Sequence, residues 1–202
     1  MIVASRRRIW VIALIFGFGL VSSCGGDPAQ PPKISPQLLS GEAKPYAVIS
    51  ENDNSFSGRK RLIFGIFSTA DTANSMALTV VQAARDLQKS TSADLVEICL
   101  YPSEKLAAIG DNYTAKALYA PDGGGSSGTQ GWKWDVCAAS QPYTQQEIKI
   151  GEEWWGNRKR FQLKNGGTDE PALKKFLSEK LGLPLNEIEL PDHFCDTTIN
   201  VR

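Results

Sequence analysis

Four cysteines and one histidine are the residues of this sequence that could carry out covalent chemistry. His193 lies two residues before Cys195, and a cysteine thiolate activated by a histidine base is a known type of nucleophile. Residues two apart on an extended strand point the same way, so the two side chains could meet. We favour a structural histidine beside a disulfide-bonded cysteine. Because a zinc site needs about four ligands and the sequence has no compact cluster of cysteine and histidine, we expect no metal and no other cofactor.

The first 23 residues have the pattern of a secretory signal peptide. A basic cluster at residues 6–8 precedes an apolar run at residues 9–21. That run is too short for a membrane-spanning helix, which needs about 20 apolar residues to cross a hydrocarbon core about 30 Å thick. Two small residues, Ser22 and Ser23, stand before Cys24, where a signal peptidase would cut.

The segment Val21-Ser22-Ser23-Cys24 resembles the lipobox of bacterial lipoproteins. The resemblance implies that the Cys24 sulfur receives a diacylglyceryl group and that the signal peptide is removed before this residue. Two alternatives are an uncut segment that anchors the chain and an ordinary cysteine beside an ordinary cleavage site. Several acyl chains would hold the protein firmly on a membrane, since each buried methylene contributes about 0.8 kcal/mol. In such lipoproteins an aspartate after the cysteine favours retention at the inner membrane. Gly25 stands there instead, which favours the periplasmic side of the outer membrane in an organism that has one.

The chain is therefore expected to have three parts: a signal peptide at residues 1–23, a lipidated Pro/Gly-rich tether at 24–45 and a single globular domain at 46–202. The whole sequence has 22 basic and 22 acidic residues, and removal of the three signal arginines leaves 19 basic residues and a net charge of about −3. Nucleic-acid binding, which needs a basic stripe facing the phosphates, is not predicted. Export out of the cytoplasm permits disulfides.

Once Cys24 is acylated, three cysteines remain and at most one disulfide can form within the chain. Cys137 falls on the outward face of a predicted strand, and Cys195 lies in a carboxyl-terminal tail that needs fixing. Cys99 lies in an apolar strand and is expected to be a free, buried thiol. All three pairings stay open, because the loops that they close differ too little in length for loop entropy to distinguish them. We favour Cys137–Cys195.

The segment at residues 152–161 combines adjacent tryptophans, Trp154 and Trp155, with a basic run, Arg158, Lys159 and Arg160. If the segment is a strand, the two tryptophans cannot both face the core, and one of them is exposed. An exposed aromatic ring beside cations suits an interface with a protein, a sugar polymer or a lipid headgroup layer. The alternative is a hairpin whose second tryptophan covers a neighbouring edge and whose basic run is solvated.

Two other patterns are weaker signals. The glycine-rich segment at residues 121–128 lacks the spaced glycines and terminal Lys-Ser or Lys-Thr of a phosphate-binding loop, so we expect a flexible hairpin connection. The adjacent acids Glu152 and Glu153 have no visible partner in a common pocket, as a pair of glycosidase carboxylates would need.

Hydrophobic periodicity predicts an α+β fold: a mostly antiparallel sheet of about five strands with two helices packed on it. The first helix, residues 72–89, has an apolar stripe at spacings of three and four and an expected N-cap at Asp71 or Asn74. The second, residues 168–182, begins with a capping residue and ends at Gly182. Strands are expected at residues 46–50, 61–67, 95–101, 115–120 and 132–138, and the tail at 190–201 is a candidate edge strand.

The order of these elements over residues 46–138 resembles a domain of unknown function that is scattered through bacterial proteins. The resemblance implies a fold and assigns no site. We expect a membrane-anchored envelope lipoprotein that binds an envelope protein or a cell-wall component without catalysis. An exclusion-type or structural envelope lipoprotein is the alternative, and an envelope hydrolase is disfavoured because no nucleophile–base pair with an orienting group is visible.

Overall fold

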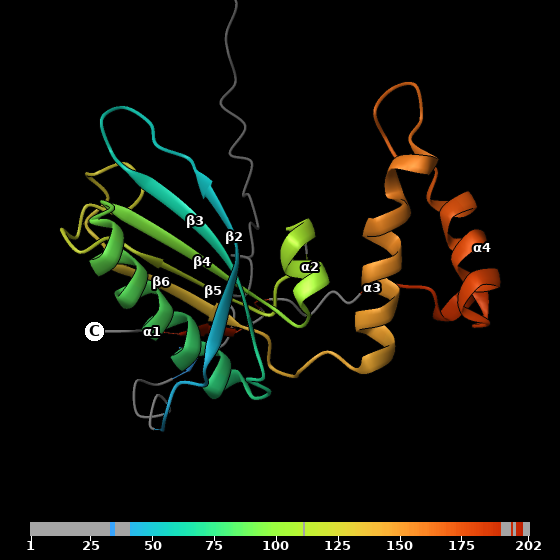
Figure 1. Ribbon diagram of the computed structural model, residues 1–202, viewed down its shortest axis with the longest axis horizontal. Coiled ribbons are helices and arrows are strands. Elements are labelled where there is room, and N and C mark those ends of the chain that lie inside the picture. Colours follow the sequence, from blue (N-terminus) through green and yellow to red (C-terminus); the bar gives the residue numbers. More distant parts are fainter. Residues whose placement is uncertain (1–32, 35–40, 111, 191–194, 196, 200–202) are drawn as a thin grey trace, which may run out of the picture. The chain divides into compact units, whose positions relative to one another are not determined.

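The computed structural model describes residues 33–34, 41–110, 112–190, 195 and 197–199 (Figure 1). The predicted signal peptide, Cys24 and His193 lie outside these residues. In the part of the chain that is described, none of the helices is both long and apolar enough to cross a membrane.

The centre of the fold is one open sheet with the strand order β1-β7-β6-β5-β4-β3-β2. The pairs β3–β4 and β1–β7 are parallel, and the other four neighbouring pairs are antiparallel. The prediction of an α+β fold with a mostly antiparallel sheet is confirmed, and β2 to β6 are its five longer strands. The bounds are β1 (Lys33–Ile34), β2 (Tyr46–Asp53), β3 (Arg61–Ser68), β4 (Leu95–Tyr101), β5 (Ala115–Tyr119), β6 (Trp134–Ala138) and β7 (Thr197–Ile199).

The short strands β1 and β7 tie both ends of the described chain to the sheet. β7 comes from the predicted tail and pairs with β6 on one side. Its other side is taken by β1, which belongs to the predicted tether, so that β7 lies inside the sheet and β1 lies at its edge. A disulfide between Cys137 of β6 and Cys195 fixes the chain just before β7, with the two Cα atoms 4.9 Å apart.

Helix α1 (Ala73–Thr91) connects β3 to β4 as a parallel crossover and lies along one face of the sheet (Figure 1). Its apolar stripe packs on alternate residues of the central strands, forming the largest core of the domain. The N-cap is Thr72, and the prediction of Asp71 or Asn74 is wrong. The Thr72 hydroxyl accepts from the Ser75 N–H at 3.1 Å and the Ser75 hydroxyl accepts from the Thr72 N–H at 3.0 Å, a reciprocal capping box.

The carboxyl-terminal third forms a second, helical core. It consists of α3 (Gln145–Asn157), the 3₁₀ turn η2 (Arg158–Phe161), α4 (Glu170–Leu181) and η3 (Leu185–Glu187). The prediction of α4 is confirmed, with Asp169 as N-cap and Gly182 in the left-handed conformation at its end. The core residues of this unit are Ile150, Trp154, Leu173, Leu177 and Ile188.

Helix α3 corrects the interpretation of residues 152–161 as a strand or hairpin, because both tryptophans lie in its last turns. Its start is fixed by a capping box between Thr144 and Glu147. The short helix α2 (Glu104–Ile109) packs beside it, and a third core joins α2 to the second face of the sheet. Because α1 covers one face of β3 and β4 and α2 covers part of the other, these strands are apolar on nearly every residue.

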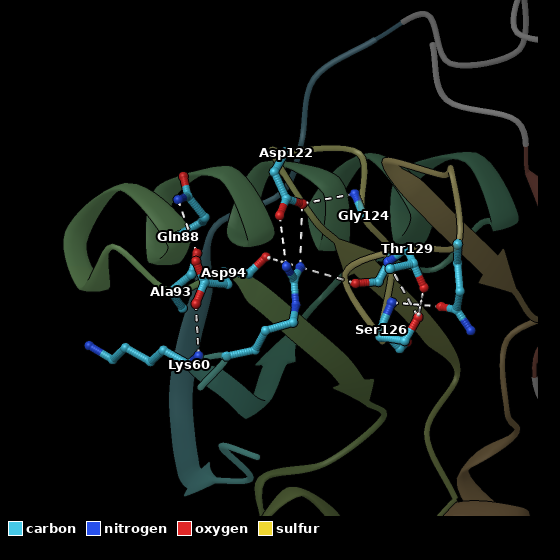
Figure 2. A network of polar contacts seen from close by, with 12 residues as sticks. Lys60, Gln88, Ala93, Asp94, Asp122, Gly124, Ser126 and Thr129 are labelled. Carbon is cyan, nitrogen blue, oxygen red and sulfur yellow. Dashed lines mark hydrogen bonds and ion pairs between the residues drawn. The ribbon is translucent and has the colours of Figure 1, made fainter. Parts of the chain in front are cut away.

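Arg59 fastens the glycine-rich loop between β5 and β6 to the β2–β3 turn through hydrogen bonds to Asp122 and Asp94. Figure 2 shows these two acids in the polar network. The guanidinium donates to both Asp122 carboxylate oxygens, at 2.7 and 3.3 Å, and to the backbone carbonyls of Asp94 and Gly125. The Asp122 carboxylate also accepts from the Gly124 N–H at 2.9 Å. The loop connects β5 and β6 as a hairpin, as predicted. Hydrogen bonds hold it in place, whereas a flexible connection was expected.

The Arg59 contact lowers the pKa of Asp122 from its usual value to about 2. A carboxylate with a lowered pKa in the folded state stabilises that state above its unfolded pKa of about 4. This contribution is lost as the pH falls toward 2. We therefore expect Asp122→Asn to unfold at a lower temperature than wild type at pH 7, with the difference shrinking below pH 4 and vanishing near pH 2. Thermal unfolding followed by circular dichroism across this range tests it, and a difference that does not change with pH would contradict it.

Candidate functional site

A pocket of about 400 Å³ lies where α2, the end of α3, η2 and the loop at residues 162–168 meet. The lining contains three of the five residues that the sequence analysis selected as an interaction surface: Trp155, Arg158 and Lys159. The remaining lining residues are Ile109, Gln162, Gly166 and Thr168. Trp154 and Arg160, the other two selected residues, do not line the pocket.

The position of each tryptophan follows from the helix that carries it. Adjacent residues in an α-helix point about 100° apart, because one turn has 3.6 residues. Trp154 therefore faces α4 and is 5% exposed inside the helical core. Trp155 is partly buried and packs against both the helical core and the core around α2. One of the two tryptophans was expected to be exposed on a strand, whereas Trp155 is only partly exposed and the element is a helix.

Two contacts orient the side chain of Arg158, which lines this pocket. Its guanidinium lies over the Trp155 ring, 4.9 Å from the ring centroid. Its Nε donates a hydrogen bond to the Thr168 hydroxyl at 3.0 Å. Thr168 is positioned by a small turn, in which the Leu163 N–H donates to the Gly167 carbonyl at 2.8 Å and residue 168 bridges to Gln162. The aromatic ring and the hydroxyl therefore fix the orientation of the guanidinium.

Arg160 has a different role, because its side chain fastens η2 to α4. The guanidinium lies 4.8 Å from the ring centroid of Phe176 and donates to the Asn157 side-chain oxygen at 3.1 Å. Asn157 in turn donates to the Glu153 backbone carbonyl at 2.7 Å. Arg160 thus belongs to the internal structure of the helical unit.

The acids nearest in sequence to the basic run are neutralised by other cations. The Glu153 carboxylate accepts from Lys180 of α4, lies 3.4 Å from Lys105 Nζ and accepts from Asn157 at 3.0 Å. The hydrogen bond from Lys180, followed by the charge of Lys105, holds the pKa of Glu153 below its usual value. Glu152 also pairs with Lys105 at 3.5 Å. Both carboxylates are therefore ion-pair partners that join α2, α3 and α4.

Over the described residues, no carboxylate forms an ion pair with Arg158, Lys159, Arg160 or Lys164. The sequence between residues 154 and 168 contains no acid at all. The pocket consequently carries two cations without a protein counter-ion, on a domain whose net charge is otherwise negative.

The other chemical candidates are not part of this pocket. Cys195 is bonded to Cys137, as the sequence analysis favoured, and therefore has no thiolate to act as a nucleophile. Cys99 is the free, buried cysteine that was expected. Burial, and then the Glu97 carboxylate, raise the pKa of the Cys99 thiol to about 12. Within the ranges that the structure describes, no three residues with metal-binding side chains come together.

Four lining residues were not found from the sequence: Ile109, Gln162, Gly166 and Thr168. They come from α2 and from a loop, so only tertiary packing places them beside Trp155. The one available signal was the run without acids at residues 154–168, which marks the segment but not its partners.

The fold and the pocket define an α+β domain with an open sheet, a helical extension and a cationic pocket, among whose described lining residues there is no acid, histidine or free cysteine. Residues 41–194 match a family model described as "Domain of unknown function (DUF4875)". The chain therefore belongs to this family. The match extends beyond the resemblance over residues 46–138 and includes α3, η2 and α4, so the pocket lies within the family domain.

A solved structure supports the same fold. The chain is similar to the protein described as "Crystal structure of a DUF487 family protein from Desulfovibrio piger ATCC 29098", with 31% sequence identity and a TM-score of 0.61. The similarity covers 75% of this chain and 93% of that chain. No curated protein matches the sequence.

The free energy of unfolding tests the different roles of Arg160 and Lys159. Arg160→Ala removes a cation–π contact and a hydrogen bond, so we expect it to lower the free energy of unfolding by about 1 kcal/mol. Lys159→Ala removes an exposed side chain without a protein partner and should change it by less than about 0.5 kcal/mol. Urea unfolding of both variants measures the difference. Equal losses for the two variants would contradict the assignment of Arg160 to the internal structure.

The cysteine assignment predicts the reactivity of each thiol. In a Cys24→Ala variant at pH 8, no thiol should react with a maleimide reagent while the domain is folded, because the Cys99 thiol is buried and protonated. One thiol should react after unfolding and three after reduction, as counted by mass spectrometry. Cys195→Ser should lower the free energy of unfolding by about 4 kcal/mol, the chain-entropy value for a loop of this length. A rapidly labelled thiol in the folded protein would overturn the assignment.

Proposed function

We propose that this chain is a membrane-anchored envelope lipoprotein whose domain is a non-enzymatic binding module. The pocket formed by Trp155, Arg158 and Lys159 is its binding site, and its partner is an envelope protein or a cell-wall component. The observation that carries the proposal is the pair of unneutralised cations beside a partly buried aromatic ring in a pocket of ligand size.

Two features of the pocket favour binding over catalysis. Its lining offers cations, an amide, a hydroxyl and apolar surface, and these are recognition groups. A hydrolase would need a nucleophile, a base and a group that orients the base. The nearby carboxylates are already held by Lys105 and Lys180, and Cys195 is held in a disulfide.

The location rests on the amino-terminal sequence. The lipobox-like segment ending at Cys24 supports a lipid anchor, and the tether after it would place the domain close to the membrane surface. The disulfide between Cys137 and Cys195 is consistent with export, because disulfides form and persist in oxidising compartments. The periplasmic side of the outer membrane is the proposed site in an organism that has one.

One experiment in intact cells tests both parts of the proposal. The full chain is expressed with a photo-crosslinking amino acid at position 159 and, as a matched control, at position 175, an exposed lysine on α4 away from the pocket. The membrane fraction is then examined by intact mass, beside a Cys24→Ala variant. We expect a chain that has lost residues 1–23 and gained acyl chains, and a discrete crosslinked product from position 159 alone.

Each part of the proposal can fail separately. An uncut, unacylated chain, or no mass difference caused by Cys24→Ala, would reject the lipid anchor. Identical products from positions 159 and 175, or none from position 159, would reject the pocket as a binding site. Loss of the product on Arg158→Glu, with an unchanged circular dichroism spectrum, would connect it to the cationic pocket.

A further inference from the structure

The geometry around Arg158 leaves one side of its guanidinium open for a ligand. The guanidinium lies over the ring of Trp155, and the Thr168 hydroxyl accepts from Nε. The two terminal nitrogens, Nη1 and Nη2, make no hydrogen bond to any residue that the structure describes. A guanidinium held in this way presents two parallel donors, which match the two oxygens of a carboxylate or phosphate.

The neighbouring groups add charge and an apolar wall. Lys159 also lines the pocket and has no carboxylate partner among the described residues. Ile109, which is 38% exposed, contributes apolar surface beside the Trp155 ring. A pocket of about 400 Å³ is at the smaller end of the range for small-molecule sites, and it has room for more than the anionic group itself.

Four other cations in ion pairs or ring contacts do not offer the same combination. Arg59 gives its terminal nitrogens to Asp122 and to two backbone carbonyls. Lys105 and Lys180 are paired with Glu152 and Glu153. Arg160 lies against Phe176 and donates to Asn157. Arg158 is thus an oriented arginine that lines a pocket and keeps its two terminal nitrogens unpaired.

We propose that the pocket binds an oxyanion, a carboxylate or a phosphate, through Nη1 and Nη2 of Arg158, with Lys159 adding charge and Ile109 and Trp155 contacting the sugar or apolar portion that carries the anion. This inference rests on the proposed binding role of the same pocket and adds the chemistry of the ligand. The anionic group enters between the two cations, and the ligand body lies along the apolar wall. Binding weakens with salt, because the charges meet at a partly exposed site.

Three sugars of similar size separate the chemistry. Glucuronate carries a carboxylate, glucose 6-phosphate carries a phosphate and glucose carries neither. The full chain, purified in detergent, is titrated with each sugar by calorimetry at low salt, and the Trp155 indole N–H is followed by NMR. We expect saturable binding of at least one anionic sugar, a shift of the Trp155 signal and no binding of glucose.

Variants then assign the binding to Arg158. Arg158→Gln should weaken the affinity at least about tenfold, since a hydrogen bond to a charged group is lost. Arg158→Lys keeps the charge but loses the planar pair of donors and should fall between wild type and Arg158→Gln. Lys164→Ala is the matched control, because Lys164 is exposed on the same segment and does not line the pocket. It should bind like wild type.

The outcomes distinguish the sources of the anion. Binding of glucuronate alone identifies a carboxylate ligand, and binding of glucose 6-phosphate alone identifies a phosphate ligand. Equal binding of glucose, or an affinity that does not change in Arg158→Gln with an intact circular dichroism spectrum, overturns the inference. If no anionic sugar binds but position 159 still crosslinks to a partner in cells, the oxyanion inference is wrong and the binding role of the pocket stands.

Discussion

The close approach of β2 and α2 to the parallel pair β3–β4 is the constraint on which the rest of the structure depends. Gly65 of β3 lies beneath this contact, and a Cβ atom at this position would meet Ser50 Oγ at 2.3 Å and the Ala107 carbonyl at 3.2 Å. The Ser50 hydroxyl donates to the Ala107 carbonyl at 3.2 Å, so the edge strand and α2 are joined directly over the glycine. With α1 on the opposite face, the central strands are buried on both sides.

The position of α2 determines where the pocket can form. Leu106 and Ala107 of α2 are fully buried in the core that also receives Trp155 from α3. Ile109 follows Leu106 by three residues and Ala107 by two on the same helix, so it lines the pocket together with Trp155. A side chain at Gly65 would displace the Ser50 hydroxyl and press on the Ala107 carbonyl of α2. The pocket is thus coupled to the packing of the sheet through a single short helix.

The sequence predicted those elements whose local signals agree with their packing. β3 and β4 are continuous apolar runs because both of their faces are covered, and α1 and α4 have apolar stripes and clear ends. The favoured disulfide followed from Cys137 lying on the outward face of β6. α3 was missed because adjacent tryptophans favour a strand by propensity, whereas the capping box of Thr144 and Glu147 and the core contacts of Trp154 stabilise a helix. The residue types of the site could be recognised, but their arrangement could not, because Ile109 and Thr168 reach Trp155 only in the folded chain.

The positive charge of the pocket stays unpaired because the neighbouring acids form ion pairs with other cations. Glu152 and Glu153 are close in sequence to Arg158, and an ion pair between them would have neutralised the site. Glu152 instead pairs with Lys105, and Glu153 pairs with Lys105 and Lys180, so that together they hold α2 and α4 against α3. The same ion pairs that assemble the helical unit therefore leave Arg158 and Lys159 without a counter-ion. Since residues 24–202 contain more acidic than basic residues, the pocket is a local positive region, and the field of the protein would guide an anionic group to it more readily than to the surrounding surface.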